Sequence, residues 1–260
     1  MDLNTVQKLD ALNARFYRKI AEDFNQTRSF YWHGWREFLP YLQLLVAERE
    51  QLNVLDIGCG NGRFGKFVFD YLPAVPISYT GIDNNQQLLE LADTKLKQTH
   101  LDVELKPVNI VKALIDKNFA TQLTPKYNVI VLFGVLHHVP SLKLRKKLMS
   151  ELKSILVDGG IIILTLWRFL DSKKLQNKLK SFDQLSIDQS QLEPNDYLLS
   201  WQRGSTAYRY CHYTDREEER ELVAVSGLKI IDTFESDGKE GRGNKYLVLS
   251  KNFTTKKNKL

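Results

Sequence analysis

Three observations predict an α/β fold for this chain, with a mostly parallel sheet and helices on both faces. Between residues 53 and 166, short apolar runs alternate with segments of helical periodicity, which is typical of parallel strands joined by helical crossovers. The last two apolar runs, 228–234 and 246–249, are joined by a connection too short for a crossover helix, so they should be antiparallel. With 43% hydrophobic and 26% charged residues, the chain of 260 residues can bury a sizeable core, which excludes a fibre or a wholly disordered chain.

The elements follow in order from the spacing of apolar residues. Leu9, Leu12, Phe16 and Ile20 share one face of a helix, and we expect residues 1–50 to form a helical lead-in against the main domain, 51–250. Strands are expected at 53–57, 77–82, 103–105, 127–133 and 161–166, and helices at 64–72, 86–97 and 142–156.

Beyond residue 169 the alternation is interrupted. Residues 170–207 are polar and basic, and we expect them to form an insertion over the edge of the sheet. Thr214 and Glu217 have the spacing of a capping box, which opens a helix that should end before Gly227. The segment 251–260 is basic with almost no apolar residues, so we expect a disordered tail.

Charge and cysteine content limit the classes of function. The chain has 37 Lys plus Arg against 31 Asp plus Glu, which favours an anionic partner without requiring one. Cys59 and Cys211 are far apart in sequence, so we expect neither a disulfide framework nor a metal site. No apolar run approaches the roughly 18 residues of a membrane span, and residues 1–20 lack a signal-peptide core. We therefore expect a soluble, cytoplasmic protein without a membrane partner.

The strongest local motif is a glycine-rich turn between the first strand and the next helix. Gly58, Gly60 and Gly62 allow the backbone to approach a ligand at a helix N-terminus. In a dinucleotide fingerprint the third glycine stands five positions after the first, but here that position is Arg63. Asp83 ends the second strand, where a carboxylate can accept hydrogen bonds from both hydroxyls of a ribose. A tight turn with a capping aspartate is the alternative, but the two motifs on successive strand ends favour a nucleoside cofactor.

The run from Asp56 to Gly62, Asp83 and the block 128–139 together resemble the class I methyltransferases that use S-adenosyl-L-methionine, over about residues 50–169. This resemblance implies a Rossmann-like sheet of seven strands with the last one antiparallel. It implies that the three glycines contact the amino acid part of the cofactor, that Asp83 binds the ribose, and that the adenine lies near Asn109 and Ile110. The full set of implied cofactor contacts is Arg28, Asp56, Gly58, Gly60, Gly62, Asp83, Asn84, Asn109, Ile110 and Phe133.

Segments outside this core are similar to the tRNA wobble-uridine carboxymethyl methyltransferases, which esterify 5-carboxymethyluridine in an anticodon. The similarity lies in 16–28, in the pair His137-His138, in Trp167, in 208–212 preceded by Trp201, and in 243–246. It implies tRNA as a partner, and a small activating subunit as a further one. The residues implied at the acceptor are His137, Arg209 and His212 as catalytic groups, with Arg168, Trp167, His138, Trp201 and Tyr210 as substrate contacts.

The chemistry of a carboxylate acceptor agrees with these residue types. A carboxyl group with a pKa of about 4 is ionised at neutral pH, so its methylation needs positioning by donors rather than a general base.

Residues 143–180 hold ten Lys or Arg and three Asp or Glu. This positive charge would attract a polyanion or simply form a solvated face. Two other hypotheses stay open: an O- or N-methyltransferase acting on a small molecule, and a non-catalytic RNA-binding protein with this fold.

Overall fold

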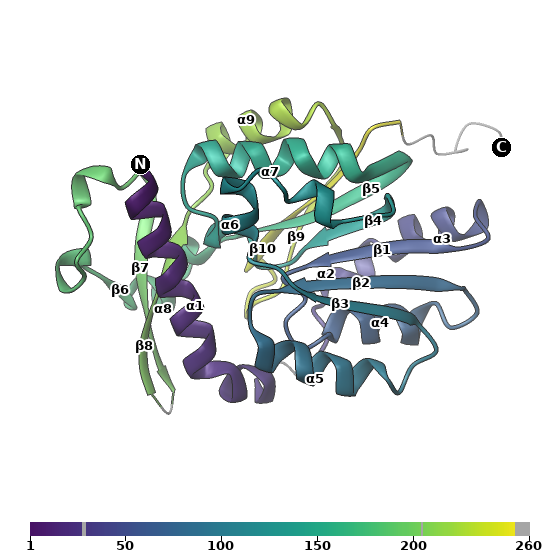
Figure 1. Cartoon of the computed structure of the whole chain (residues 1–260), viewed down its shortest axis with the longest axis horizontal. Coiled ribbons are helices and arrows are strands. Elements are labelled where there is room, and N and C mark those ends of the chain that lie inside the picture. The colour runs from purple at the N-terminus through teal and green to yellow at the C-terminus, as the bar shows by residue number, and fades with distance from the viewer. Residues whose placement is uncertain (28–29, 204, 253–260) are drawn as a thin grey trace.

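The computed structural model describes residues 1–27, 30–203 and 205–252. A seven-stranded sheet has the strand order β3-β2-β1-β4-β5-β10-β9, and a second, three-stranded sheet has the order β6-β7-β8 (Figure 1). The strands are β1 Leu52–Ile57, β2 Ile77–Asp83, β3 Asp102–Pro107, β4 Tyr127–Leu132, β5 Leu156–Trp167, β6 Leu179–Lys180, β7 Asp196–Arg203, β8 Ser205–His212, β9 Lys229–Ser236 and β10 Asn244–Ser250. The helices are α1 Leu3–Gln26, α2 Gly34–Glu37, α3 Leu39–Ala47, α4 Arg63–Tyr71, α5 Gln86–Leu96, α6 Ile110–Ile115, α7 Leu142–Ile155, α8 Lys173–Gln176 and α9 Arg216–Ser226.

The large sheet has the predicted topology. Strands β1 to β5 pair in parallel, and β10 is antiparallel to both β5 and β9. Every residue of β4 is buried, because helices α6, α7 and α9 cover one face of the sheet and α2 to α5 cover the other (Figure 1). This double coverage explains why the central strands are uninterrupted apolar runs rather than alternating ones.

The second sheet and α1 lie together over the carboxyl ends of the large sheet. Leu9 and Leu12 of α1 pack on Leu198 of β7, while Phe16 and Ile20 pack on Ala207 of β8. These are the apolar positions that predicted the helix, so the buried face of α1 was assigned correctly. The sequence did not predict the sheet on which that face packs: the insertion expected at 170–207 forms strands that continue to His212.

The starts of α9 and β5 differ from the prediction. Asp215, not Thr214, caps α9, because its Oδ1 accepts from the backbone N–H groups of both Glu217 and Glu218, at 3.0 and 2.9 Å. The helix does end at Gly227, which has a left-handed φ of 59°. Strand β5 begins at Leu156, five residues earlier than predicted, and a register shift in its pairing with β4 accommodates the extra residues.

A buried ion network joins the second sheet to α7 and α9. Arg145 of α7 is fully buried, and its guanidinium contacts Glu218 at 2.5 Å and Glu193 at 3.0 Å. His212 lies between Asp196 (2.8 Å) and Glu218 (2.5 Å), with one carboxylate at each ring nitrogen. Since isolated buried charges are costly, removal of one member of such a network leaves its partners uncompensated.

We predict that replacement of Gly62 destabilises the fold more than replacement of a glycine with a similar φ whose Cβ would meet no neighbouring atom. Gly62 has a φ of +69°, and a Cβ there would lie 3.0 Å from the Cβ and 3.1 Å from the Cα of Ala92 in α5. Gly241 has a similar φ of +70° with nothing within 4 Å. Gly241→Ala should therefore cost about 1–2 kcal/mol, the penalty of left-handed backbone, and Gly62→Ala should cost more in urea unfolding. Equal losses for the two variants would contradict this packing.

A second prediction concerns the pH dependence of stability. Burial opposes protonation of His212, but its hydrogen bonds to Asp196 and Glu218 outweigh this effect and raise the pKa of the imidazole. The stabilisation from His212 should be fully present below about pH 6.5, the unfolded value, and lost as the pH rises through the raised folded pKa. The difference in unfolding free energy between wild type and His212→Asn should therefore shrink as the pH rises above about 6.5 and through the raised pKa.

The exposed His100 provides the control for this measurement. His100→Asn removes an imidazole that has no carboxylate partner among the described residues, so it provides the baseline against which the His212→Asn difference is measured. A His212→Asn difference that stays constant with pH would mean that the imidazole is not charged in the folded protein.

Candidate functional site

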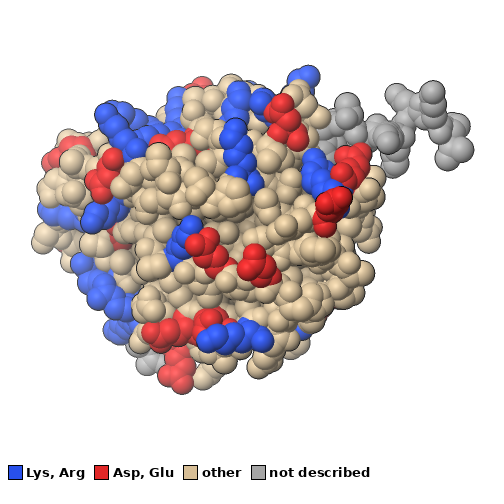
Figure 2. All heavy atoms as spheres, turned by 45° about the vertical axis from the view of Figure 1, so that its right-hand side comes forward, with Lys and Arg blue, Asp and Glu red and all other residues tan. Residues whose placement is uncertain are grey.

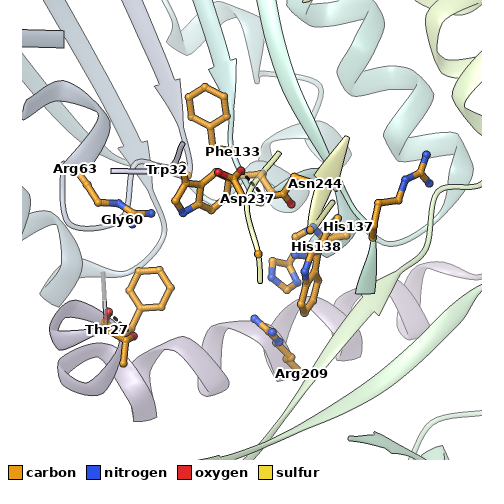
Figure 3. A pocket seen from close by; sticks show the side chains of 18 of the residues that line it. Thr27, Trp32, Gly60, Arg63, Phe133, His137, His138, Arg209, Asp237 and Asn244 are labelled. Atoms are coloured by element: carbon orange, nitrogen blue, oxygen red, sulfur yellow. Dashed lines mark hydrogen bonds between the residues drawn. The ribbon is translucent and has the colours of Figure 1, made fainter. Parts of the chain in front are cut away.

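A cavity of about 1600 Å³ lies where the carboxyl ends of β1, β2, β4 and β5 face α1 and the second sheet (Figure 3). Residues of these elements, or those that directly follow the strands, line it, so it contains both of the regions that the sequence singled out. Gly58 and Asp83 lie in one part of the lining, and Trp167 and Arg209 in the other. The parts are described below as the cofactor half and the acceptor half.

The glycine turn forms the floor of the cofactor half. Gly58 has a φ of +69°, and a Cβ at this position would lie 2.4 Å from Cγ2 of Val135, so no larger residue fits. Gly60 also lines the cavity, and its N–H donates to Oδ2 of Asp83 at 3.0 Å. Gly62 does not line the cavity; it instead allows α4 to approach α5. Its predicted cofactor contact is therefore replaced by a packing role.

Two carboxyl groups stand beside this turn. Asp83 accepts hydrogen bonds from the N–H groups of Gly60 and Asn85, and burial raises its pKa despite these bonds. Burial raises the pKa of Asp56 to about 7, although the Tyr79 hydroxyl donates to it at 2.6 Å. Both groups line the cavity. Burial thus disfavours the ionised forms of both carboxyl groups. A cation or a hydrogen-bond donor placed beside them would favour ionisation.

Other predicted cofactor contacts also line this half: Asn84, Asn109, Ile110 and Phe133. Asn109 caps α6, since its Oδ1 accepts from the N–H of Lys112 at 2.9 Å. Its Nδ2 donates to Asp10 of α1 at 2.7 Å, a residue that the sequence did not indicate. Arg28, also predicted as a contact, lies outside the described residues.

In the acceptor half, Arg209 of β8 is held by aromatic side chains. Its guanidinium carbon lies 4.7 Å from the centroid of the Trp167 ring and 5.3 Å from that of Phe16. Its Nη1 donates to the hydroxyl of Tyr17 at 3.4 Å, and among the described residues it forms no ion pair with a carboxylate. Figure 3 shows Arg209 directed toward His137 and His138. The cation is therefore fixed in place without being neutralised.

His138 has both ring nitrogens engaged. Nδ1 lies 2.9 Å from the carbonyl oxygen of Tyr210, which can only accept, so Nδ1 carries the proton. Nε2 must then accept from the hydroxyl of Tyr17, at 2.7 Å. Burial, with the Arg209 charge as a second cause, lowers the pKa of His138 to about 3. This histidine is consequently a neutral group that connects α1 to β8.

His137 is also neutral but has no such partner. Burial first, and then the neighbouring His138 and Arg209, lower its pKa well below the usual value. Its Nδ1 is buried and makes no hydrogen bond to the described part of the chain. The ring lines the cavity 5.0 Å from the Trp167 ring, measured between centroids. A buried hydrogen-bonding atom without a partner, on a ring that lines a cavity, is a candidate contact for a ligand.

The structure separates the remaining predicted acceptor residues into two groups. Trp201 and Arg168 line the cavity, although Arg168 also donates to the carbonyl of Thr214 at 3.1 Å and lies 3.8 Å from Glu219. His212 and Tyr210 do not line it and belong to the buried ion network instead, which corrects the sequence prediction. The reason is the period of two of a β-strand, which directs both side chains away from the face that carries Arg209.

The structure also brings together side chains that could ligate a metal. One group is His137, His138 and Cys211, and the other is Glu193, Asp196 and His212, each with ligand atoms within 4.8 Å of one another. In the first group His138 already uses both nitrogens. In the second, Arg145 contacts Glu193 and His212. Hydrogen bonds and ion pairs of the protein thus occupy most of these ligand atoms.

No helix in the described ranges is long and apolar enough to cross a membrane. The lining also contains four residues of α1 that the sequence analysis did not name as site residues, Asp10, Asn13, Tyr17 and Phe24. Helical periodicity identifies such positions only as partly polar, because it contains no information on which distant strand end they face.

Comparison with known proteins agrees with this geometry. A family model described as a methyltransferase domain matches residues 26–233. A putative methyltransferase of Encephalitozoon cuniculi is 29% identical over 218 residues, which cover 84% of this chain and 87% of that protein. The tRNA (carboxymethyluridine(34)-5-O)-methyltransferase of Arabidopsis thaliana is 27% identical over 154 residues, which cover 59% of this chain and 32% of that protein.

Among solved structures, an S-adenosylmethionine-dependent methyltransferase from Clostridium acetobutylicum superposes with a TM-score of 0.63 at 16% identity, over 91% of this chain and 99% of that one. At this identity the likeness concerns the fold. The family is shown by the family model, which matches most of the chain. The chain therefore belongs to the methyltransferase domain family, and its cofactor is S-adenosyl-L-methionine.

Proposed function

We propose that this methyltransferase esterifies a carboxylate, that of 5-carboxymethyluridine at the wobble position of a tRNA. The observation that carries the proposal is Arg209, an accessible cation in the acceptor half that is held by Trp167 and Tyr17 and has no carboxylate partner in the described chain. A guanidinium that no carboxylate of the described chain pairs with offers N–H groups that match the two oxygens of a substrate carboxylate.

The cofactor half fits S-adenosyl-L-methionine. The glycine turn places the backbone of Gly58 and Gly60 at the surface of the cavity, and the two oxygens of Asp83 suit a ribose diol. When bound, the cofactor supplies a methyl group on a positively charged sulfur. Asp56, whose pKa burial raises to about 7, would ionise more readily beside such a cationic ligand. We assign Asp83 to the ribose and Asp56 to the amino acid end on these grounds.

The protonation state of the acceptor half favours an acceptor that is already anionic. A hydroxyl group usually has to lose a proton as it is methylated, and the base that takes the proton should have a pKa near the working pH. The pKa values of His137 and His138 are lowered, to about 3 for the latter, so both are weak proton acceptors. A carboxylate needs no base, and these neutral imidazoles can orient it without the strong ion pairing that would weaken its attack.

The tRNA component is supported by the Arabidopsis relative and by part of the predicted basic segment. Lys173, Lys174 and Lys178 line the cavity at its acceptor half. The basic residues of α7 do not line it: Arg145 is buried, and Lys146 is paired with Glu221. On the face drawn in Figure 2, Lys and Arg are interspersed with Asp and Glu. We therefore restrict the proposed phosphate contacts to α8 and the segment after it, rather than to all of 143–180.

Replacement of Arg209 tests the proposal directly. Arg209→Ala should reduce single-turnover methyl transfer to carboxymethyluridine tRNA by at least about a hundredfold, as expected for loss of charged hydrogen bonds in a buried site. Cofactor affinity should change little. Arg209→Lys should recover only part of the activity, since an ammonium lacks the planar fork.

Arg220→Ala is a matched control, since Arg220 is exposed on α9 and outside the cavity. It should retain wild-type activity. Full activity of Arg209→Ala on this tRNA would overturn the assignment of the acceptor carboxylate to Arg209.

The proposed phosphate contacts are tested by charge reversal. Replacement of Lys173, Lys174 and Lys178 by Glu should weaken tRNA binding and make it less dependent on salt, because fewer counterions are released on binding. Titration with S-adenosylhomocysteine should be unaffected. The same change at Lys143, Lys146 and Lys153 of α7, which lie outside the cavity, alters the net charge equally. Identical salt slopes for the two triple variants would remove α8 from the proposed tRNA surface.

A further inference from the structure

Asp10 is a carboxylate in the cofactor half that neither the fold nor the acceptor chemistry requires. It comes from α1, yet it lines the cavity together with Asn109 and Ile110. Asn109 lies just beyond Asp83 across the sheet, since the N–H of Val108 donates to the carbonyl of Asp83 at 3.0 Å. A nucleoside whose ribose is held by Asp83 would therefore have its base near Asn109 and Asp10.

The orientation of this pair is fixed by α6. The Oδ1 of Asn109 accepts from the N–H of Lys112 at 2.9 Å, so its Nδ2 must point the other way. There it donates one hydrogen to Oδ2 of Asp10, at 2.7 Å. The second hydrogen of Nδ2 and the Oδ1 of Asp10 make no hydrogen bond to the described residues. The pair thus presents a donor beside an acceptor.

The carboxylate is also without a compensating cation. No Lys or Arg within the described part of the chain forms an ion pair with it, and burial raises its pKa although the Asn109 hydrogen bond acts in the opposite direction. Asp10 does not cap α6, because the Asn109 side chain already performs that function. A half-buried acceptor of this kind gains stability from an additional donor.

We propose that Asp10 recognises the exocyclic amino group of the cofactor's adenine and so determines the base specificity of this enzyme. Adenine presents an amino donor at C6 beside an acceptor nitrogen at N1, which complements the acceptor and donor of the Asp10–Asn109 pair. A 6-oxo purine reverses both groups, so its carbonyl oxygen would face the carboxylate. The proposal concerns the cofactor alone and does not depend on the identity of the methyl acceptor.

Calorimetric titration of the full chain with S-adenosylhomocysteine and with its 6-oxo analogue, S-inosylhomocysteine, tests this proposal. Wild type should bind the adenosyl compound at least about tenfold more tightly. Asp10→Asn can still accept from Asn109 through its carbonyl oxygen, but it presents N–H donors to the base. It should lose about tenfold in affinity for the adenosyl compound and gain affinity for the inosyl compound, which would reverse the preference.

Glu22→Gln is the matched control, because it removes one carboxylate from an exposed position of the same helix. It should keep the wild-type ratio of the two affinities. An unchanged ratio in folded Asp10→Asn would show that the pair only attaches α1 to α6 and would overturn the proposal. Should Asp10→Asn fail to fold, the wild-type ratio decides alone: equal affinity for the two compounds contradicts recognition of the amino group.

Discussion

A short chain of hydrogen bonds through His138 holds the acceptor half together. Its Nδ1–H donates to the backbone of β8 and its Nε2 accepts from Tyr17 of α1, whose hydroxyl in turn accepts from Arg209. Two segments that are far apart in sequence, α1 and β8, are thereby attached to the turn that follows β4. Because both ring nitrogens are used and burial lowers the pKa of the ring, the connection is insensitive to pH near neutrality. The position of Arg209 depends on it.

The two halves of the cavity are built by different means. The cofactor half depends on the backbone of the glycine turn, where Gly58 and Gly60 adopt left-handed φ angles and the N–H of Gly60 is fixed by Asp83. The acceptor half is formed by side chains of α1 and β8 that are stacked or hydrogen-bonded in place. Backbone geometry tolerates few substitutions, whereas side chains can be exchanged singly. This difference explains how one fold can retain a cofactor and vary its acceptor.

The features predictable from sequence are those determined by local patterns. Strand β4 is identified by its apolar run, and the places of Gly58 and Asp83 at successive strand ends predict that both line one cavity, as they do. The second sheet was missed because its strands lie in a polar segment and pair with one another across turns without a strong signal. The resemblance of the segment 208–212 to the tRNA methyltransferases assigns His212 to the acceptor. The alternation along β8 instead places its side chain in the network around Arg145. Asp10 and the contact of Tyr17 with His138 could not be found, because only the docking of α1 brings these side chains to the strand ends.

The chemical stability of the transferred methyl group tests the central claim, that the acceptor is a carboxylate. The full chain would be incubated with methyl-labelled S-adenosyl-L-methionine and tRNA that carries 5-carboxymethyluridine at the wobble position, and the recovered RNA would then be treated with mild alkali. We predict that the label enters the RNA and is released as methanol, as required for a methyl ester. Label that remains on the nucleosides after this treatment would contradict the account, since an N-methyl or ether product does not hydrolyse under these conditions.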